Sequence, residues 1–159
     1  CLALAERLED VEAAANCQTE LGVLYAGLGE WPRAAHFAAA GLATYAALAM
    51  PTYAVTNRST LALAALRGGQ LAAALAQAAQ VAEVVRAGGG DGVDYPARDC
   101  WVCALVWEAA GRTDDAAAML ALGRAIVAQR AARISDPAMR SQFMRGAPFH
   151  ELVDALPED

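Results

Sequence analysis

Apolar residues recur at intervals of three or four positions along most of the chain, and short polar or glycine-containing breaks interrupt them. This period of about 3.6 residues predicts amphipathic helices, because strands would alternate with a period of two. The pattern therefore predicts an all-α protein. The breaks divide the chain into expected helices at about 2–8, 11–28, 31–49, 52–67, 70–87, 94–110, 113–133, 136–144 and 148–156.

Residues at several breaks support these boundaries. Pro51 fits the opening turn of the fourth expected helix, where a missing N–H costs nothing. Asp136 and Pro137 are suited to the N-cap and the first position of a later helix. The glycine-rich run at 88–92 is the clearest break, and it lacks the lysine and hydroxyl of a phosphate-binding loop. We interpret this run as a flexible connector.

A helix–turn–helix pattern recurs along the chain. The segment 21–35 contains the end of one helix, the turn glycine Gly29 and the start of a second helix. A shift of 40 residues brings Gly69 to the place of Gly29, and a further shift of 42 residues brings Gly111 there. Small residues recur in the same register after each turn, at Ala34, Ala74 and Ala116. The chain is therefore expected to contain three helical hairpins.

Each repeated position has a mechanical role. A glycine after a helix can adopt the left-handed conformation that caps the C-terminus, and this conformation is costly for other residues. A small alanine early in the second helix leaves room for the facing helix. Because a lone hairpin cannot bury its apolar face, we expect the hairpins to stack on one another.

The segment 21–35 resembles the tetratricopeptide repeat in the residue types that this family repeats, at Leu21, Gly22, Tyr25, Gly29 and Ala34. Intervals of 40 and 42 residues exceed the usual length of about 34. Longer repeats of this kind resemble the C-terminal arms of large bacterial signal-transduction ATPases. The closing part of such arms is similar to Tyr95-Pro96-Ala97-Arg98 with Trp101 and Cys103, and to the run from Arg130 to Phe143.

The resemblance implies a short right-handed α-solenoid that occupies 1–159 as a single repeat domain. Its repeats would lie at about 11–50, 51–88 and 93–134, and closing short helices at about 136–156. It also implies that the chain senses a signal or holds a partner, while catalysis occurs in other domains. Because the chain opens on Cys1 rather than on methionine, we expect it to be a fragment of a longer protein.

In the family that the segment resembles, the first helix of each hairpin lines a concave surface. The corresponding positions here are spaced by three, four and three residues, which places each set on one helix face. This surface would have polar residues at its entrance, apolar residues along its floor, and Arg and Trp residues at one end. Such a combination would suit an extended peptide. The expected groove residues are Asn16, Thr19, Val23 and Ala26; Thr56, Ser59, Leu63 and Leu66; and Arg98, Trp101, Leu105 and Glu108. The alternative is that these residues line the seam between helices or face water.

The charge and the cysteine content of the chain limit the kinds of partner and the cellular location that we expect. The net charge of -6 argues against nucleic acid as a partner. Arginines nevertheless gather in the second half, at Arg124, Arg130, Arg133, Arg140 and Arg145. Four cysteines are too few for a disulfide scaffold, so we expect free thiols in a reducing, cytoplasmic environment. No apolar run is long enough for a membrane span, so we expect no membrane partner.

Candidate catalytic and metal-binding residues have structural alternatives. Cys100 and Cys103 form a C-x-x-C, but they fall inside an expected helix rather than at its N-terminus, so we interpret them as packing residues. His36 and His150 lack an evident nucleophile partner and supply a metal site poorly. We therefore expect no enzyme activity, no metal and no cofactor.

The leading functional hypothesis is a non-catalytic protein-interaction or sensor module of a multidomain bacterial signalling or transcriptional regulator. Its partner would be a protein, a peptide or another domain of the parent chain. One alternative is a small-molecule-sensing pocket in the concave groove, and another is a structural element of self-association. Leu2, Leu4 and Leu8 are expected to leave an apolar strip at the N-terminal edge, which would support a homodimer through residues about 1–28.

Overall fold

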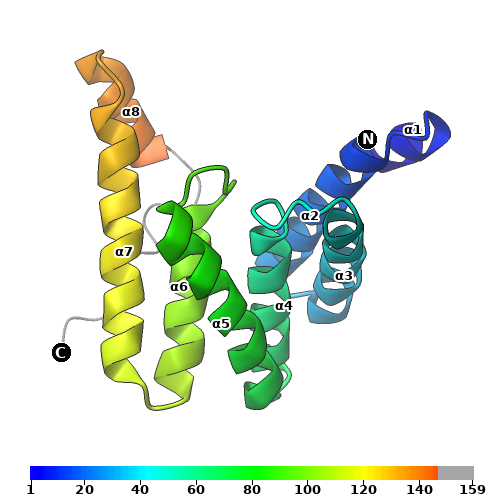
Figure 1. Cartoon of the computed structure of the whole chain (residues 1–159), viewed down its shortest axis with the longest axis horizontal. Coiled ribbons are helices and arrows are strands. Elements are labelled where there is room, and N and C mark those ends of the chain that lie inside the picture. Colours follow the sequence, from blue (N-terminus) through cyan, green and yellow to red (C-terminus); the bar gives the residue numbers. More distant parts are fainter. Residues whose placement is uncertain (147–159) are drawn as a thin grey trace.

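The computed structural model describes residues 1–146, and within this range the chain is helical with no strand (Figure 1). The expectation of an all-α protein is confirmed. The last expected helix, at 148–156, lies outside the described residues. The helices are α1 (Leu2–Arg7), α2 (Val11–Gly27), α3 (Trp31–Ala47), α4 (Val55–Arg67), α5 (Leu71–Gly88), α6 (Pro96–Ala109), α7 (Thr113–Ala132) and α8 (Pro137–Gly146).

The start of α4 differs from the sequence-based expectation. Pro51 does not open this helix, because residues 51–54 form a turn and α4 begins at Val55. The ring of Tyr53 stacks on that of Tyr45, with 5.7 Å between centroids, and this contact holds the turn against the end of α3. Packing of an aromatic side chain therefore overrides the local preference of proline for a first helical turn.

The start of α8 follows the expectation. The Asp136 carboxylate accepts hydrogen bonds from the backbone N–H groups of Ala138 and Met139, at 2.7 and 3.0 Å. Pro137 is the first residue of the helix. Asp136 thereby satisfies two of the N–H groups that have no partner within a helix.

The three turns that the sequence places in register are closed in the same way. Their glycines have left-handed φ values of 74° at Gly29, 72° at Gly69 and 72° at Gly111. In each turn the next residue donates its N–H to a carbonyl five residues back, as in a Schellman cap. These bonds are Glu30 to Tyr25 at 2.9 Å, Gln70 to Ala65 at 2.9 Å and Arg112 to Trp107 at 2.8 Å.

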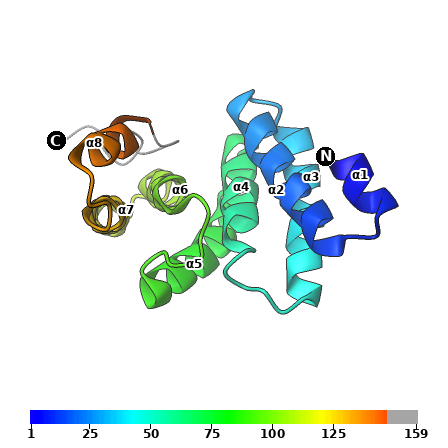
Figure 2. The same cartoon turned by 90° about the horizontal axis from the view of Figure 1, so that it is seen from above.

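Each of these turns joins two helices that pack against one another: α2 with α3, α4 with α5, and α6 with α7. Ala34, Ala74 and Ala116 are buried, as expected for small residues between the two helices of a hairpin. Seen from above, α6, α7 and α8 lie on one side of the molecule, α1 to α3 on the other, and α4 with α5 between them (Figure 2). The largest apolar core lies among α4, α5, α6 and α7, and includes Val81, Val106 and Met119.

The glycine-rich run forms the expected connector between α5 and α6. Gly89 caps α5 in the left-handed conformation. The Arg130 guanidinium on α7 donates hydrogen bonds to the carbonyls of Gly90 and Val93, at 2.7 and 2.9 Å. The connector is therefore held against α7 by the side chain of Arg130, which lies 40 residues after Gly90 in the sequence.

The cysteines depart from the expectation of four free thiols. Cys1 and Cys17 form a disulfide, which ties the start of α1 to the middle of α2. The pairing arises because α1 folds back beside α2, so that two residues 16 positions apart meet. Cys100 and Cys103 are free and buried. None of the helices in residues 1–146 combines the length and the apolar character that crossing a bilayer requires.

Candidate functional site

Most of the expected groove residues do not line an open groove. Besides Ala26, five of the twelve expected groove residues are buried, namely Thr19, Thr56, Ser59, Leu63 and Arg98. Three are half-buried, namely Val23, Trp101 and Leu105, and only Asn16 and Glu108 are exposed. Of the two remaining positions, Ala26 is buried and Leu66 is half-buried. The buried residues lie in the seam between helices, as the alternative interpretation had it.

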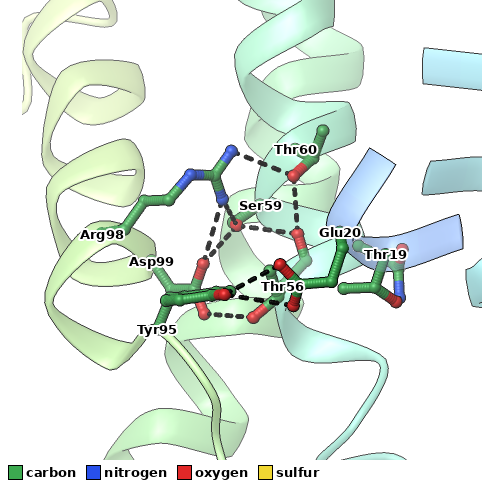
Figure 3. Close-up of polar contacts among 9 residues, drawn as sticks. Thr19, Glu20, Thr56, Ser59, Thr60, Tyr95, Arg98 and Asp99 are labelled. Carbon is green, nitrogen blue, oxygen red and sulfur yellow. Dashed lines mark hydrogen bonds and ion pairs between the residues drawn. The ribbon is translucent and has the colours of Figure 1, made fainter. Parts of the chain in front are cut away.

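The structure brings three of these buried residues into one polar network between α4 and α6 (Figure 3). The Arg98 guanidinium donates to the hydroxyls of Ser59, at 2.8 Å, and of Thr60, at 3.0 Å. It also forms an ion pair with the carboxylate of Asp99, at 3.3 Å. Both charged side chains are almost fully enclosed, with 3% and 0% of their surface exposed.

The carboxylate of Asp99 is satisfied from the other side. It accepts hydrogen bonds from the hydroxyls of Thr56, at 3.0 Å, and of Ser59. Burial raises the pKa of Asp99 and lowers the pKa of Arg98, and the attraction between the two charges opposes both shifts. Because a buried charge is tolerated only when it is paired and hydrogen-bonded, these contacts account for the presence of the pair in an alanine-rich interior.

Two further contacts join α2 to the same assembly. Asn57 on α4 donates its amide to the hydroxyl of Thr19 on α2, at 2.9 Å. The Tyr95 hydroxyl, at the start of α6, lies 2.9 and 3.1 Å from the carboxylate oxygens of Glu20 on α2. Burial and the Glu20 carboxylate raise the pKa of Tyr95 to about 12, so the hydroxyl stays protonated and donates. The first helices of the three hairpins are therefore linked by polar contacts.

Several members of this network are not predicted by the repeat pattern in the sequence. Asp99, Thr60 and Asn57 were not among the expected groove residues. The available signal was the adjacent pair Arg98-Asp99 within an otherwise apolar stretch. Because such charges are rarely buried without a partner, the pair predicts hydroxyl or amide groups on the facing helix.

The C-x-x-C on α6 packs in the core, as expected. Burial raises the pKa of Cys100 to about 12 and raises that of Cys103 well above its ordinary value. The thiol of Cys103 lies 3.4 Å from the carbonyl oxygen of Ala78, to which it donates. Both groups therefore stay protonated, whereas a redox cysteine needs an accessible thiolate.

An open cavity of about 450 Å³, which we name the acidic cavity, lies where the start of α2 meets the end of α3. The stacked rings of Tyr45 and Tyr53 form an aromatic wall, and Tyr53 is 41% exposed. Three carboxylates stand around these rings. The lining residues are Asp10, Glu12, Ala13, Asn16, Tyr45, Tyr53 and Asp94.

Burial and neighbouring charges shift the pKa values of two groups that line the acidic cavity. Burial raises the pKa of Tyr45, and the charges of Asp94 and Glu12 raise it further, while a hydrogen bond with Thr19 acts in the opposite direction. Desolvation by neighbouring atoms raises the pKa of Asp94, although its side chain stays open to solvent, and the charge of Arg130 opposes that shift. The charges of Asp94 and Glu12 therefore act on Tyr45, whereas the pKa of Asp94 is raised by desolvation.

A second open cavity, which we name the apolar cavity, has a volume of about 680 Å³ and lies between α1 and α2. Asn16 lines both cavities. The remaining lining residues are Cys1, Leu2, Ala3, Cys17, Glu20, Leu21 and Leu24. The exposed amide of Asn16 thus stands between an apolar surface and an acidic one on the N-terminal half of α2.

Across residues 1–146, no three His, Cys, Asp or Glu side chains are grouped so that they could hold a metal ion. His36 lies exposed on α3, and His150 lies outside the described residues. Comparison of the chain with protein-family models, with curated proteins and with solved structures found no significant match.

Proposed function

We propose that this chain is a non-catalytic interaction module that binds a segment of a partner protein along the N-terminal half of α2. The observation that carries the proposal is that Asn16 lines two open cavities of opposite character, one apolar and one acidic. A segment that presents an apolar side chain beside a basic one matches both surfaces. The exposed amide of Asn16 can hydrogen-bond to the backbone of the bound segment.

We also propose that the architecture is a short right-handed solenoid of tetratricopeptide-like repeats. Three hairpins follow one another, and equivalent turns close them at Gly29, Gly69 and Gly111. A buried alanine recurs after each of these turns. The polar contacts among α2, α4 and α6 support a rigid arrangement of the hairpins, which suits a binding scaffold because little ordering is needed on association.

A non-catalytic role is supported by the state of the reactive groups. The Arg98–Asp99 pair is enclosed and hydrogen-bonded within the protein, and the thiols of Cys100 and Cys103 are buried. The groups that remain accessible on α2 are carboxylates, an amide and apolar side chains, which suit recognition. This supports assigning catalysis to other domains of a parent regulator.

The resemblance to arms of bacterial regulators supports a role in a multidomain signalling or transcriptional protein. A cytoplasmic location stays a prediction, and the Cys1–Cys17 disulfide weighs against it, because disulfides are rare in reducing compartments.

A small-molecule sensor is the second candidate. The acidic cavity, at about 450 Å³, falls within the range of roughly 300–1,000 Å³ that is typical of small-molecule sites. Its carboxylates and tyrosines would then recognise a free cationic compound.

Selection from a random peptide display library tests the proposal. The selected peptides should pair apolar and basic residues, and calorimetry should give a dissociation constant for each. Leu24, which is 54% exposed in the apolar cavity, should matter, so Leu24→Glu should weaken binding about tenfold or more.

The matched control is Leu48→Glu, because Leu48 is similarly exposed, at 42%, but lies at the end of α3 and lines neither cavity. This variant should bind the peptides as the unaltered chain does. Failure to enrich any peptide over an unrelated helical protein would contradict the proposal. Equal binding by the Leu24→Glu variant would contradict it too.

A further inference from the structure

We propose that the acidic cavity is a binding site for an ammonium or guanidinium group, held over the exposed ring of Tyr53 and between the carboxylates of Glu12 and Asp94. This inference rests on the proposed function and names the chemical group that this part of the surface recognises. The site is built from four separate parts of the chain, namely the start of α2, the end of α3, the turn before α4 and the connector before α6.

The carboxylates of the acidic cavity differ from other surface carboxylates in their ion pairing. Within residues 1–146, neither Glu12 nor Asp94 takes part in an ion pair. Other surface carboxylates do find partners, as in the pairs of Glu30 with Arg33 at 3.0 Å and Asp115 with Arg112 at 2.7 Å. The third carboxylate, that of Asp10, accepts a hydrogen bond from the N–H of Ala13 and caps α2.

The charge of Arg130 lowers the pKa of Asp94, but the guanidinium of Arg130 forms its hydrogen bonds with other groups. It donates to the carbonyls of Gly90 and Val93, which holds it against the connector. Its charge offsets part of the negative potential at Asp94 and leaves the contributions of Glu12 and Asp10. The carboxylates around the cavity therefore keep a net negative charge, and partial desolvation strengthens their attraction for a cation.

The aromatic wall of the cavity adds a second attraction for a cation. Tyr45 is 2% exposed and fixed in the interior, and Tyr53 stacks on it with an interplanar angle of 30° while remaining 41% exposed. An exposed aromatic ring beside carboxylates attracts a cation through its electron-rich face as well as through the neighbouring charges. The protein already uses this contact elsewhere, since the Arg33 guanidinium lies 4.0 Å from the centre of the Tyr25 ring.

The cation has two sources with the same chemistry, a basic side chain of the bound segment or a free organic cation. The experiment uses N-acetyl-arginine amide as the free probe and its uncharged analogue N-acetyl-citrulline amide as the control. It also uses a peptide selected on the chain, prepared with arginine and with citrulline at its basic position. Nuclear magnetic resonance titration of the complete chain reports the affinity and the residues affected.

Asp94→Asn is the test variant, and Asp114→Asn is the matched control, because Asp114 is exposed in the first turn of α7 and lines neither cavity. We expect arginine probes to shift the resonances around Tyr45 and Tyr53, and citrulline probes to bind at least about fivefold more weakly. The Asp94→Asn variant should lose about the same factor, and Tyr53→Leu should also weaken binding. Asp114→Asn should bind as the unaltered chain does.

The outcomes separate the two sources and the two proposals. Preference for the arginine peptide, lost in Asp94→Asn, supports a side chain as the cation. Binding of free N-acetyl-arginine amide at the same resonances with comparable affinity supports a small cation. Equal binding of arginine and citrulline probes would overturn the inference and leave the peptide-binding function standing. If no peptide is selected, the proposed function fails, and the free-probe titration still decides whether the cavity takes a cation.

Discussion

Arg98 and Asp99 are adjacent on α6, and both side chains turn toward the hydroxyl groups of α4. In an interior made mostly of alanine and valine, such directional contacts fix the rotation and the height of one helix relative to the other. A buried ion pair is weak evidence for added stability, because desolvation of two charges offsets much of their attraction. We infer that this pair specifies how the second and third hairpins dock.

Removing one member of the pair should be far more damaging than removing both charges. Arg98→Met leaves the Asp99 carboxylate buried without a cation, so we expect a loss of about 3–5 kcal/mol in the free energy of unfolding. Adding Asp99→Asn removes the orphaned charge and should recover part of that loss. Chemical denaturation of the single and double variants measures both effects.

The exposed pair of Arg33 with Glu30 provides the control. Because Arg33 is 58% exposed, Arg33→Met should cost less than about 1 kcal/mol. A double variant no more stable than Arg98→Met would show that Asp99 does not need its cation.

Thiol reactivity distinguishes the two kinds of cysteine. In the folded chain Cys100 and Cys103 should react slowly with a disulfide reagent, because they are buried and burial keeps their pKa values high. After unfolding without reductant we expect two reactive thiols, and after reduction all four. Four reactive thiols in the unreduced, unfolded chain would contradict the disulfide between Cys1 and Cys17.

The helices and their turns could be predicted closely from sequence, because the signals that set them are local. Gly29, Gly69 and Gly111 each mark a helix end by a conformation that other residues avoid. The misplaced start of α4 and the unforeseen disulfide have a different origin. Both depend on contacts between parts of the chain that meet only after folding, as Tyr53 meets Tyr45 and Cys1 meets Cys17.

The candidate site was predicted less well for the same reason. Helix periodicity placed Thr56, Ser59 and Arg98 on corresponding faces, and the structure does bring them together. Periodicity does not say whether such a face meets solvent or another helix. The acidic cavity was missed because its lining comes from loops as well as helices, and no repeat relates Tyr53 to Asp94.

Overpacking the hairpins tests the repeat register. Ala34 and Ala74 are both 0% exposed between the helices of their hairpins, so Ala34→Trp and Ala74→Trp should each destabilise the chain by about 1–3 kcal/mol or more. Ala72→Trp is the control, since Ala72 is exposed on α5, and this change should have little effect. Unchanged denaturation midpoints in both test variants would show that these alanines do not set the helix spacing.

Within residues 1–146, five of the large apolar side chains that are exposed lie on or next to α1 and α2. Leu4 and Leu8 are 54% and 69% exposed, and Val11, Leu24 and Leu28 are exposed on or next to α2. The disulfide holds α1 beside α2, and the apolar cavity between them brings Leu2 near Leu21 and Leu24. An exposed apolar patch is typical of an interaction site, so we infer that this edge takes part in an association.

We predict that the chain forms a homodimer at high concentration through residues about 1–28. Sedimentation or light scattering over a range of concentrations should show the association, because burial of the exposed leucines is favourable. Leu4→Glu together with Leu8→Glu should keep the chain monomeric, whereas Leu48→Glu, on α3's C-terminal cap, should leave the dimer intact.

Self-association and partner binding would use overlapping surfaces, since Leu24 lies in the same segment and also lines the apolar cavity. A peptide that occupies this cavity should therefore compete with the dimer and shift the population toward monomer as its concentration rises. A chain that stays strictly monomeric at high concentration contradicts the dimer, as does a dimer that survives the double substitution at Leu4 and Leu8. A dimer that binds the peptide without dissociating would place the two contacts on separate parts of the edge. The apolar strip of α1 would then serve self-association alone, and the surface of α2 would remain free for the partner.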